Sequence, residues 1–273
     1  MNPVRLAFTR RWLGIFAVTV AFAVACAALG QWQFARRAEA QAAIALLNAN
    51  FDRTPASVAN VISSYDNNDR ELKWTPVTMS GHYIVDATVY ARNRVSDAGI
   101  GFEQLVPFVD DNGGILVVDR GWVAANDDYS APANPPAVPQ GDLTVVARLM
   151  PSEQTIDGRS APVGQVATIN APELAVIMTF DSPNFYTGWY SRLATESVQA
   201  QSGISWDRPV LDEGPHLSYA LQWYVFAVMG FVGYGWALRK EARGPVDSVE
   251  PKRRSARERD EELEDAAVDA ATR

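Results

Sequence analysis

The stretch His216-Leu217-Ser218-Tyr219-Ala220-Leu221-Gln222-Trp223 opens an apolar segment that continues to Leu238 without a Lys, Arg, Asp or Glu. Residues 217–238 number 22. Because a helix rises about 1.5 Å per residue, this segment is long enough to cross a hydrocarbon core of about 30 Å. We therefore expect a transmembrane helix over residues 216–238, with a histidine at the membrane surface.

A second apolar segment lies near the other end of the chain. Arg10 and Arg11 precede residues 12–29, which carry no charged side chain and are also long enough to span. Together the two segments divide the chain into predicted parts. These are a tail (1–11), a first transmembrane helix (12–29), a stalk helix and linker (30–73), a β-rich domain (74–215), a second transmembrane helix (216–238) and a disordered tail (239–273).

Charge predicts the orientation of the two spans, because Lys and Arg are retained on the cytoplasmic side of short loops. Residues 30–216 hold 12 Lys and Arg against 22 Asp and Glu, a net charge of −10. This acidic part is expected outside the cytoplasm, and its charge argues against a nucleic-acid partner. Both termini are predicted to be cytoplasmic, since basic residues flank the spans there: Arg5, Arg10, Arg11, Arg239, Lys240 and Arg243.

The first span has an alternative interpretation. Ala25-Cys26-Ala27 resembles the cleavage site of a signal peptide. The apolar run is longer than the usual 7 to 15 residues of such a peptide, so a retained anchor is favoured. Because Cys26 is the one cysteine, sites that need two are excluded, including thioredoxin-like centres, two-cysteine copper carriers, zinc ribbons and covalent c-type haem attachment. A lone cysteine in an apolar helix is expected to act as a small hydrophobe.

The central region predicts an antiparallel sheet or partly closed barrel with few short helices. Residues 31–50 lack Gly and Pro and should continue the first helix as a stalk. Asp110-Asp111-Asn112-Gly113-Gly114 predicts a hairpin turn. Short helices are expected at 57–64 and at 174–178, the latter capped by Asn170. Strands are predicted at 77–80, 83–95, 102–109, 115–123 and 143–150, with 185–190 a further candidate.

Polar and aromatic residues share one face at the outer end of each predicted span, because positions i, i+3, i+4 and i+7 lie together on a helix. They could be an ordinary aromatic belt with an arginine that reaches the headgroups, and the histidine could simply begin its helix. They also suit a planar, apolar, anionic cofactor such as a haem, with an imidazole for iron and a guanidinium for a propionate. The two faces are Leu29, Trp32, Gln33 and Arg36, and His216, Tyr219, Ala220 and Trp223.

Two further features of the central region favour structural roles. His82 follows Gly81 at a predicted strand start and is expected to be an exposed or half-buried strand residue. Arg120 lies in Asp119-Arg120-Gly121-Trp122, where the glycine permits a bend and the arginine is expected to form an ion pair with an acidic neighbour.

Three separate motifs resemble the Surfeit locus 1 family of cytochrome c oxidase assembly factors, and the likeness covers approximately residues 29–236. The motifs depart from the family where Ala40 replaces a usual Lys and Pro215 a common Asn. They are Leu29-Gly30-Gln31-Trp32-Gln33 with Arg36, Val117-Val118-Asp119-Arg120-Gly121-Trp122-Val123, and His216 to Trp223 as quoted above.

The resemblance implies a role in maturing the haem-copper oxidase, by receiving haem a and presenting it to the catalytic subunit. It implies no enzymatic activity. It places His216 as the haem iron ligand, with the lipid bilayer, the oxidase catalytic subunit and the enzyme that makes haem a as candidate partners. The tail of 11 residues before the first span lacks an Arg- and Ser-rich targeting segment, so a bacterial plasma membrane is expected. The remaining residues implied near the cofactor are Trp32, Gln33, Arg36, Tyr219 and Trp223.

Other classes of function remain open at this point. A haem-free scaffold that steadies an oxidase assembly intermediate would tolerate His216→Ala. An enzyme would need a nucleophile and a base, and the outer domain offers only His82 and no Gly-x-Ser-x-Gly elbow. An extracellular sensor would need a cytoplasmic signalling domain, which the 35 residues after Leu238 are too few to form.

Overall fold

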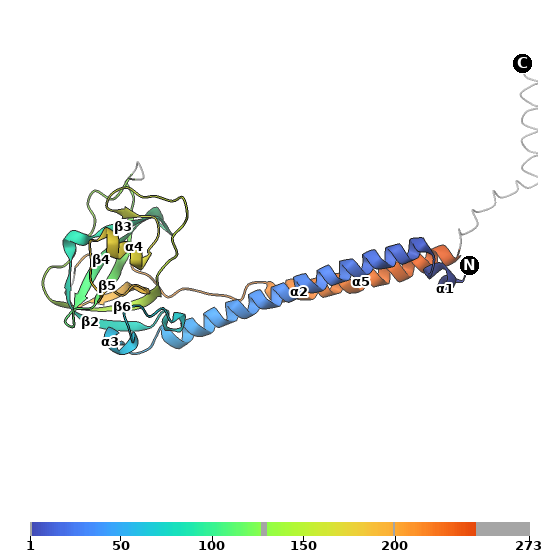
Figure 1. Cartoon of the computed structure of the whole chain (residues 1–273), viewed down its shortest axis with the longest axis horizontal. Coiled ribbons are helices and arrows are strands. Elements are labelled where there is room, and N and C mark those ends of the chain that lie inside the picture. The colour runs from blue at the N-terminus through green and yellow to red at the C-terminus, as the bar shows by residue number, and fades with distance from the viewer. Residues whose placement is uncertain (1, 127–129, 199, 244–273) are drawn as a thin grey trace, which may run out of the picture. The chain divides into compact units, whose positions relative to one another are not determined.

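The computed structural model describes residues 2–126, 130–198 and 200–243 (Figure 1). The chain separates into two compact units. The helical unit comprises Met1–Arg37 and Gly214–Arg273, and the barrel unit comprises Ala38–Glu213. The part of the predicted disordered tail beyond Arg243 lies outside the described residues.

Two long helices, α2 (Arg10–Asn50) and α5 (His216–Arg243), are long and apolar enough to cross a membrane. A short helix, α1 (Pro3–Ala7), precedes them. The helix α2 runs without a break through the predicted first span and the predicted stalk, which confirms the helical stalk. Both helices therefore contain the uncharged apolar segment from which a membrane span was predicted.

The helices of the helical unit pack in antiparallel fashion, through residues in the first part of α2 and in α5. The Trp12 ring lies 5.5 Å from the Tyr234 ring in an edge-on arrangement. Gly30 gives room to Tyr224, since a Cβ atom on this glycine would lie 2.8 Å from the tyrosine ring. Cys26 is 1% exposed, as expected for a cysteine that acts as a small apolar side chain. Residues of the predicted first span thus pack against the second helix.

The barrel unit contains one eight-stranded sheet with the order β1-β2-β6-β8-β5-β4-β3-β7. Because β2 also pairs with β4, the strands β2, β6, β8, β5 and β4 form a closed ring. The prediction of a sheet or partly closed barrel is confirmed, although the pairs β1–β2, β3–β7 and β5–β8 are parallel. The strands are β1 Ala56–Ser57, β2 Pro76–Tyr83, β3 Val89–Ser96, β4 Gly99–Asp110, β5 Ile115–Ala124, β6 Leu143–Pro151, β7 Gln165–Val166 and β8 Trp189–Glu196.

Two apolar clusters lie on opposite sides of the barrel wall. One cluster takes residues from all five strands of the ring and therefore fills the barrel, with Leu116 and Val118 of β5 among them. The other takes the alternate residues Ile115 and Val117 and packs against α4 (Ala171–Ile177) and the end of α2. The period of two along β5 thus places successive side chains in different cores.

Several predicted boundaries differ from the structure. The predicted strand 83–95 is interrupted by a 3-10 turn at Val85–Ala87, and β2 continues through Gly81 to Tyr83. Gly81 permits a close approach to β4 rather than a turn, since its Cβ would lie 2.0 Å from the Val109 carbonyl oxygen. The candidate strand 185–190 is replaced by β8, and the expected helix at 57–64 shortens to α3 (Val58–Val61). The short helix α4 is capped by Asn170, as predicted.

Candidate functional site

The helix-pair site consists of the six residues that the sequence singled out, which lie in the interior of α2 and in the first turns of α5. His216 is the first residue of α5 and is half-buried. Its Nδ1 atom lies 2.8 Å from Oε1 of Gln33 on α2. Ala220, one turn further along α5, is 0% exposed. The histidine and the glutamine therefore face each other across the helix pair, although they are 183 residues apart in the sequence.

The hydrogen bond between these side chains determines which ring nitrogen is free. Because the Oε1 atom of Gln33 is a carbonyl oxygen, it only accepts, and Nδ1 of His216 carries the donated proton. In the neutral ring, Nε2 then has a free lone pair, which is the form that binds metals. The helix pair thus holds one imidazole in a defined tautomer.

The other four residues lie within two turns of this pair along α2 and α5. The Trp32 side chain is 52% exposed and Tyr219 is 48% exposed, so both present open aromatic surface. The guanidinium carbon of Arg36 lies 5.7 Å from the centre of the Trp32 ring. Trp223 is half-buried and packs edge-on against Phe226 at 5.9 Å. The structure thus joins His216 with Gln33 and Trp32 with Arg36.

These residues fit the chemistry of a haem group on an open helix face. The free Nε2 of His216 is a suitable iron ligand, and the exposed aromatic rings of Trp32 and Tyr219 can cover an apolar macrocycle. The guanidinium of Arg36 can pair with a carboxylate in bidentate fashion. The donor set therefore agrees with an iron-containing, apolar and anionic ligand.

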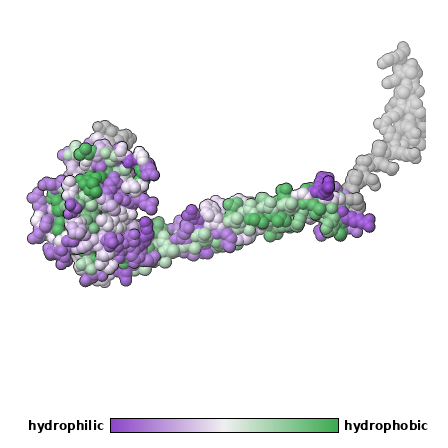
Figure 2. All heavy atoms as spheres, in the orientation of Figure 1, coloured by the Kyte–Doolittle hydropathy of each residue, from purple (hydrophilic) through white to green (hydrophobic). Residues whose placement is uncertain are grey.

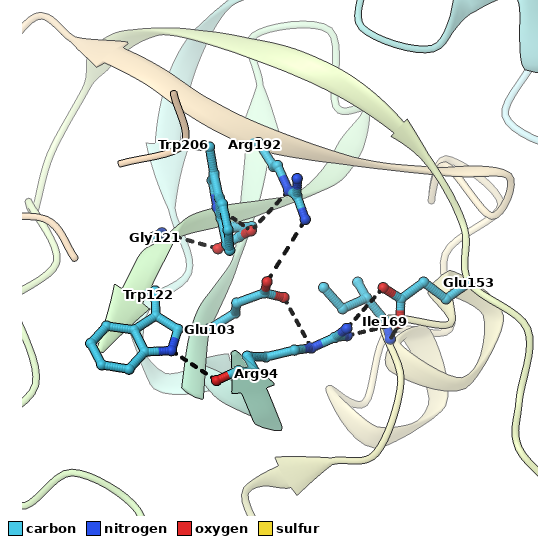
Figure 3. A network of polar contacts seen from close by, with 9 residues as sticks. Arg94, Glu103, Gly121, Trp122, Glu153, Ile169, Arg192 and Trp206 are labelled. Carbon is cyan, nitrogen blue, oxygen red and sulfur yellow. Dashed lines mark hydrogen bonds and ion pairs between the residues drawn. The ribbon is translucent and has the colours of Figure 1, made fainter. Parts of the chain in front are cut away.

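A second constellation, the buried ion network, lies in the barrel unit (Figure 3). Arg94 donates two hydrogen bonds to Glu153, at 3.1 and 2.8 Å, and its Nε lies 3.1 Å from Glu103. Arg192 lies between the two most buried carboxylates, 3.8 Å from Glu103 and 3.6 Å from Asp119. The network therefore joins three carboxyl groups to two guanidinium groups.

Burial dominates the electrostatics of this network. Burial and the nearby Asp119 carboxylate raise the pKa of Glu103. Burial also raises the pKa of Asp119, against the opposing effects of Arg192, the Gly121 amide and Trp206. Since three acids face two permanent cations, one proton on the Glu103–Asp119 pair balances the charge.

The first two residues of Asp119-Arg120-Gly121-Trp122 point to opposite sides of β5. Asp119 accepts hydrogen bonds from the Gly121 amide at 3.0 Å and from the Trp206 indole at 2.8 Å, within the network. Arg120 is 1% exposed and donates to Glu196 at 2.9 Å, on the side of the barrel interior. The predicted ion pair of Arg120 is thereby confirmed.

Sequence reasoning missed the ion network. The one local signal is that Glu103, Gln104 and Asp119 interrupt strands that are otherwise apolar, a pattern that predicts buried polar groups in need of partners. The partners Glu153 and Arg192 come from segments whose pairing the local sequence does not reveal. The network has the partners and burial of a structural element of the barrel.

His82 occupies the position expected of a surface residue on a strand. Its side chain is 53% exposed on β2, and Nδ1 lies 3.8 Å from the Asp142 carboxylate. In the part of the chain that the structure describes, no group of three or more His, Cys, Asp or Glu side chains is arranged to hold a metal ion. The helix-pair site is therefore the better candidate for a cofactor.

The fold and the helix-pair site together define a class of protein that combines a small β-barrel domain with two candidate membrane helices. Residues 20–228 match the SURF1 family, which is the Surfeit locus 1 family, and the chain belongs to it. This family is associated with the assembly of cytochrome oxidase. It is a family of assembly factors.

Individual relatives agree over most of their length. An uncharacterised SURF1-like protein of Mycobacterium tuberculosis is 31% identical over 246 residues, which cover 88% of each chain. A SURF1-like protein of Rickettsia conorii is 22% identical over 225 residues, 80% of this chain and 88% of that protein. A second Rickettsia relative, from Rickettsia bellii, is 23% identical over 211 residues, 76% of this chain and 83% of its own.

Proposed function

We propose that this protein assists the maturation of a haem-copper cytochrome c oxidase by holding haem a at the helix-pair site for delivery to the catalytic subunit. The proposal rests on the hydrogen bond between Gln33 and His216, which leaves Nε2 of the imidazole free. Membership of an oxidase assembly family supports the oxidase as the destination. Bound there, the haem would supply an iron centre that accepts a nitrogen ligand.

The side chains of the site have distinct roles in this proposal. His216 donates the Nε2 lone pair, and Gln33 fixes the orientation and tautomer of its ring. Trp32, Tyr219 and Trp223 exclude water from an apolar ligand, and Arg36 binds a carboxylate. The catalytic subunit is the proposed receiving partner, and the enzyme that makes haem a is a further candidate partner.

We also propose a location that follows from the two helices and their flanking charges. Both chain termini lie in the cytoplasm, and the barrel unit lies outside it, attached to a bacterial plasma membrane. Basic residues in the last turn of α5, Lys240 and Arg243, support this orientation. In this arrangement the helix-pair site meets the outer surface of the bilayer.

The visible spectrum of the detergent-purified protein tests the ligand. The protein is made in cells that synthesise haem a, and haem content is compared between wild type and His216→Ala. We expect the variant to lose most of its haem. Equal haem content would show that His216 is not the ligand, and normal oxidase assembly in cells carrying a haem-free variant would favour the scaffold alternative.

A second comparison tests the positioning role of the glutamine. Removing a partner that orients a metal ligand typically weakens metal binding about 10- to 100-fold. We expect Gln33→Leu to show this loss together with a shifted haem absorption band. Gln31→Leu, which alters an exposed glutamine of the same helix, serves as the matched control and should retain haem. If both variants bind alike, Gln33 does not position the ring.

A further inference from the structure

A long groove lies at the end of the helical unit that carries α1. The short helix α1 packs against α5, and its Leu6 is 5% exposed. The groove between them has a volume of about 1200 Å³. Its walls are largely apolar, with Val4 on one side and Val228, Phe231 and Trp236 on the other. Side chains with exposed apolar area therefore line a continuous concave surface.

The length of the groove corresponds to one leaflet of a bilayer. Its lining extends along α5 from Val228 to Arg243. At about 1.5 Å per residue this distance is about 22 Å. Half of a bilayer that measures about 40 to 45 Å with its headgroups is about 20 to 22 Å. A single lipid molecule thus fits the groove from headgroup to chain end.

Basic side chains line one end of the groove. Figure 2 shows hydrophilic residues where the apolar surface of the helix pair stops. Arg239, Lys240 and Arg243 line this end. Within α5 the acidic residue nearby is Glu241, and it forms an ion pair with Arg11 at 3.2 Å. The groove therefore combines an apolar channel with a cationic end, which is the complement of a lipid with a negatively charged headgroup.

We propose that this groove binds one anionic phospholipid, with its acyl chain along Phe231 and Gly235 and its phosphate headgroup at Arg239, Lys240 and Arg243. Ordinary lipid solvation of an apolar helix gives no preference for headgroup charge. The three cations at the end of the groove predict such a preference, because basic sites between membrane helices bind anionic headgroups. The site is separate from the proposed haem function and does not depend on it.

Native mass spectrometry of the full-length protein tests the charge preference. The delipidated protein is titrated with phosphatidylglycerol or with phosphatidylcholine of the same chain length. We expect phosphatidylglycerol to bind more tightly, and its binding to weaken about 100-fold when the three cations are replaced together by Gln. The matched control replaces three exposed arginines of the barrel unit by Gln, namely Arg53, Arg70 and Arg159, and should bind as wild type does.

Two glycines of α5 test the groove itself. A Cβ atom on Gly235 or on Gly233 would meet no atom within 4 Å, so both tolerate a larger side chain. Gly235 lines the groove and Gly233 does not line it. We expect Gly235→Leu to reduce phosphatidylglycerol binding at least tenfold, whereas Gly233→Leu leaves it unchanged.

Three outcomes would overturn the proposal. The first is equal binding of the two lipids by wild type. The second is equal binding of phosphatidylglycerol by the two glycine variants. The third is a dimer that Gly235→Leu breaks while lipid binding persists, which would assign the groove to a second copy of the chain.

Discussion

Replacing Arg120 by Met should strongly destabilise the barrel unit, because Arg120 neutralises a carboxylate inside the barrel. Its Nε donates to Glu196 at 2.9 Å and its Nη1 to Gln104 at 3.0 Å. The Glu196 side chain is 5% exposed and keeps only one other described hydrogen bond, from the Tyr83 hydroxyl at 2.8 Å. The variant therefore leaves a buried negative charge without a cation.

The expected size of this effect comes from the burial of both partners. Removing one partner of a buried ion pair typically costs about 3 to 5 kcal/mol. For a domain of 150 to 250 residues, each kcal/mol lowers the melting temperature by about 2 to 4 °C. Arg120→Met should thus lower it by roughly 6 to 20 °C.

Thermal unfolding of the full-length protein in detergent, followed by tryptophan fluorescence, measures this effect. The double variant Arg120→Met with Glu196→Gln removes both charges and should recover at least half of the loss, since the destabilising group is then absent. Arg159→Met, at an exposed position, should change stability by less than about 0.5 kcal/mol. The reasoning is refuted if Arg120→Met unfolds like wild type, or if the double variant is as unstable as the single one.

Two further predictions concern the helix pair and the ion network. Gly30→Leu should destabilise the helix pair by about 1 to 3 kcal/mol, since its Cβ would lie 2.8 Å from the Tyr224 ring, whereas Gly14→Leu meets no atom within 4 Å. Equal melting temperatures in detergent would contradict this. Because burial raises the pKa of Glu103, the folded state binds more protons than the unfolded chain, so stability should fall as pH rises through that raised pKa. Urea unfolding across pH should show this decline in wild type and a flatter profile in Glu103→Gln; a rise with pH in wild type would count against it.

Much of the fold could be predicted because its signals are local. Apolar length predicted α2 and α5, and runs of β-branched and aromatic residues on either side of a Gly- and Asp-containing turn predicted β4 and β5. Asn170 predicted the start of α4 by its capping position. The sequence did not predict the break at Val85–Ala87 or the bounds of β8. The strand β8 pairs in parallel with β5 and places Arg192 in a buried ion network, and the local sequence of β8 shows neither partner.

For the candidate site too, some features could be predicted from the sequence and others depend on the folded structure. The sequence by itself predicted that His216 begins an apolar helix, and that aromatic residues of both helices and Arg36 lie on the faces that carry the candidate site. Only the tertiary structure decided that Gln33 accepts a hydrogen bond from the imidazole, and that Asp119 and Arg120 enter separate buried networks. Local propensity and periodicity depend on neighbours along the chain. The partner of a buried polar group depends instead on which distant segments pack together, since each such group needs a hydrogen bond or counter-charge that only the folded chain supplies.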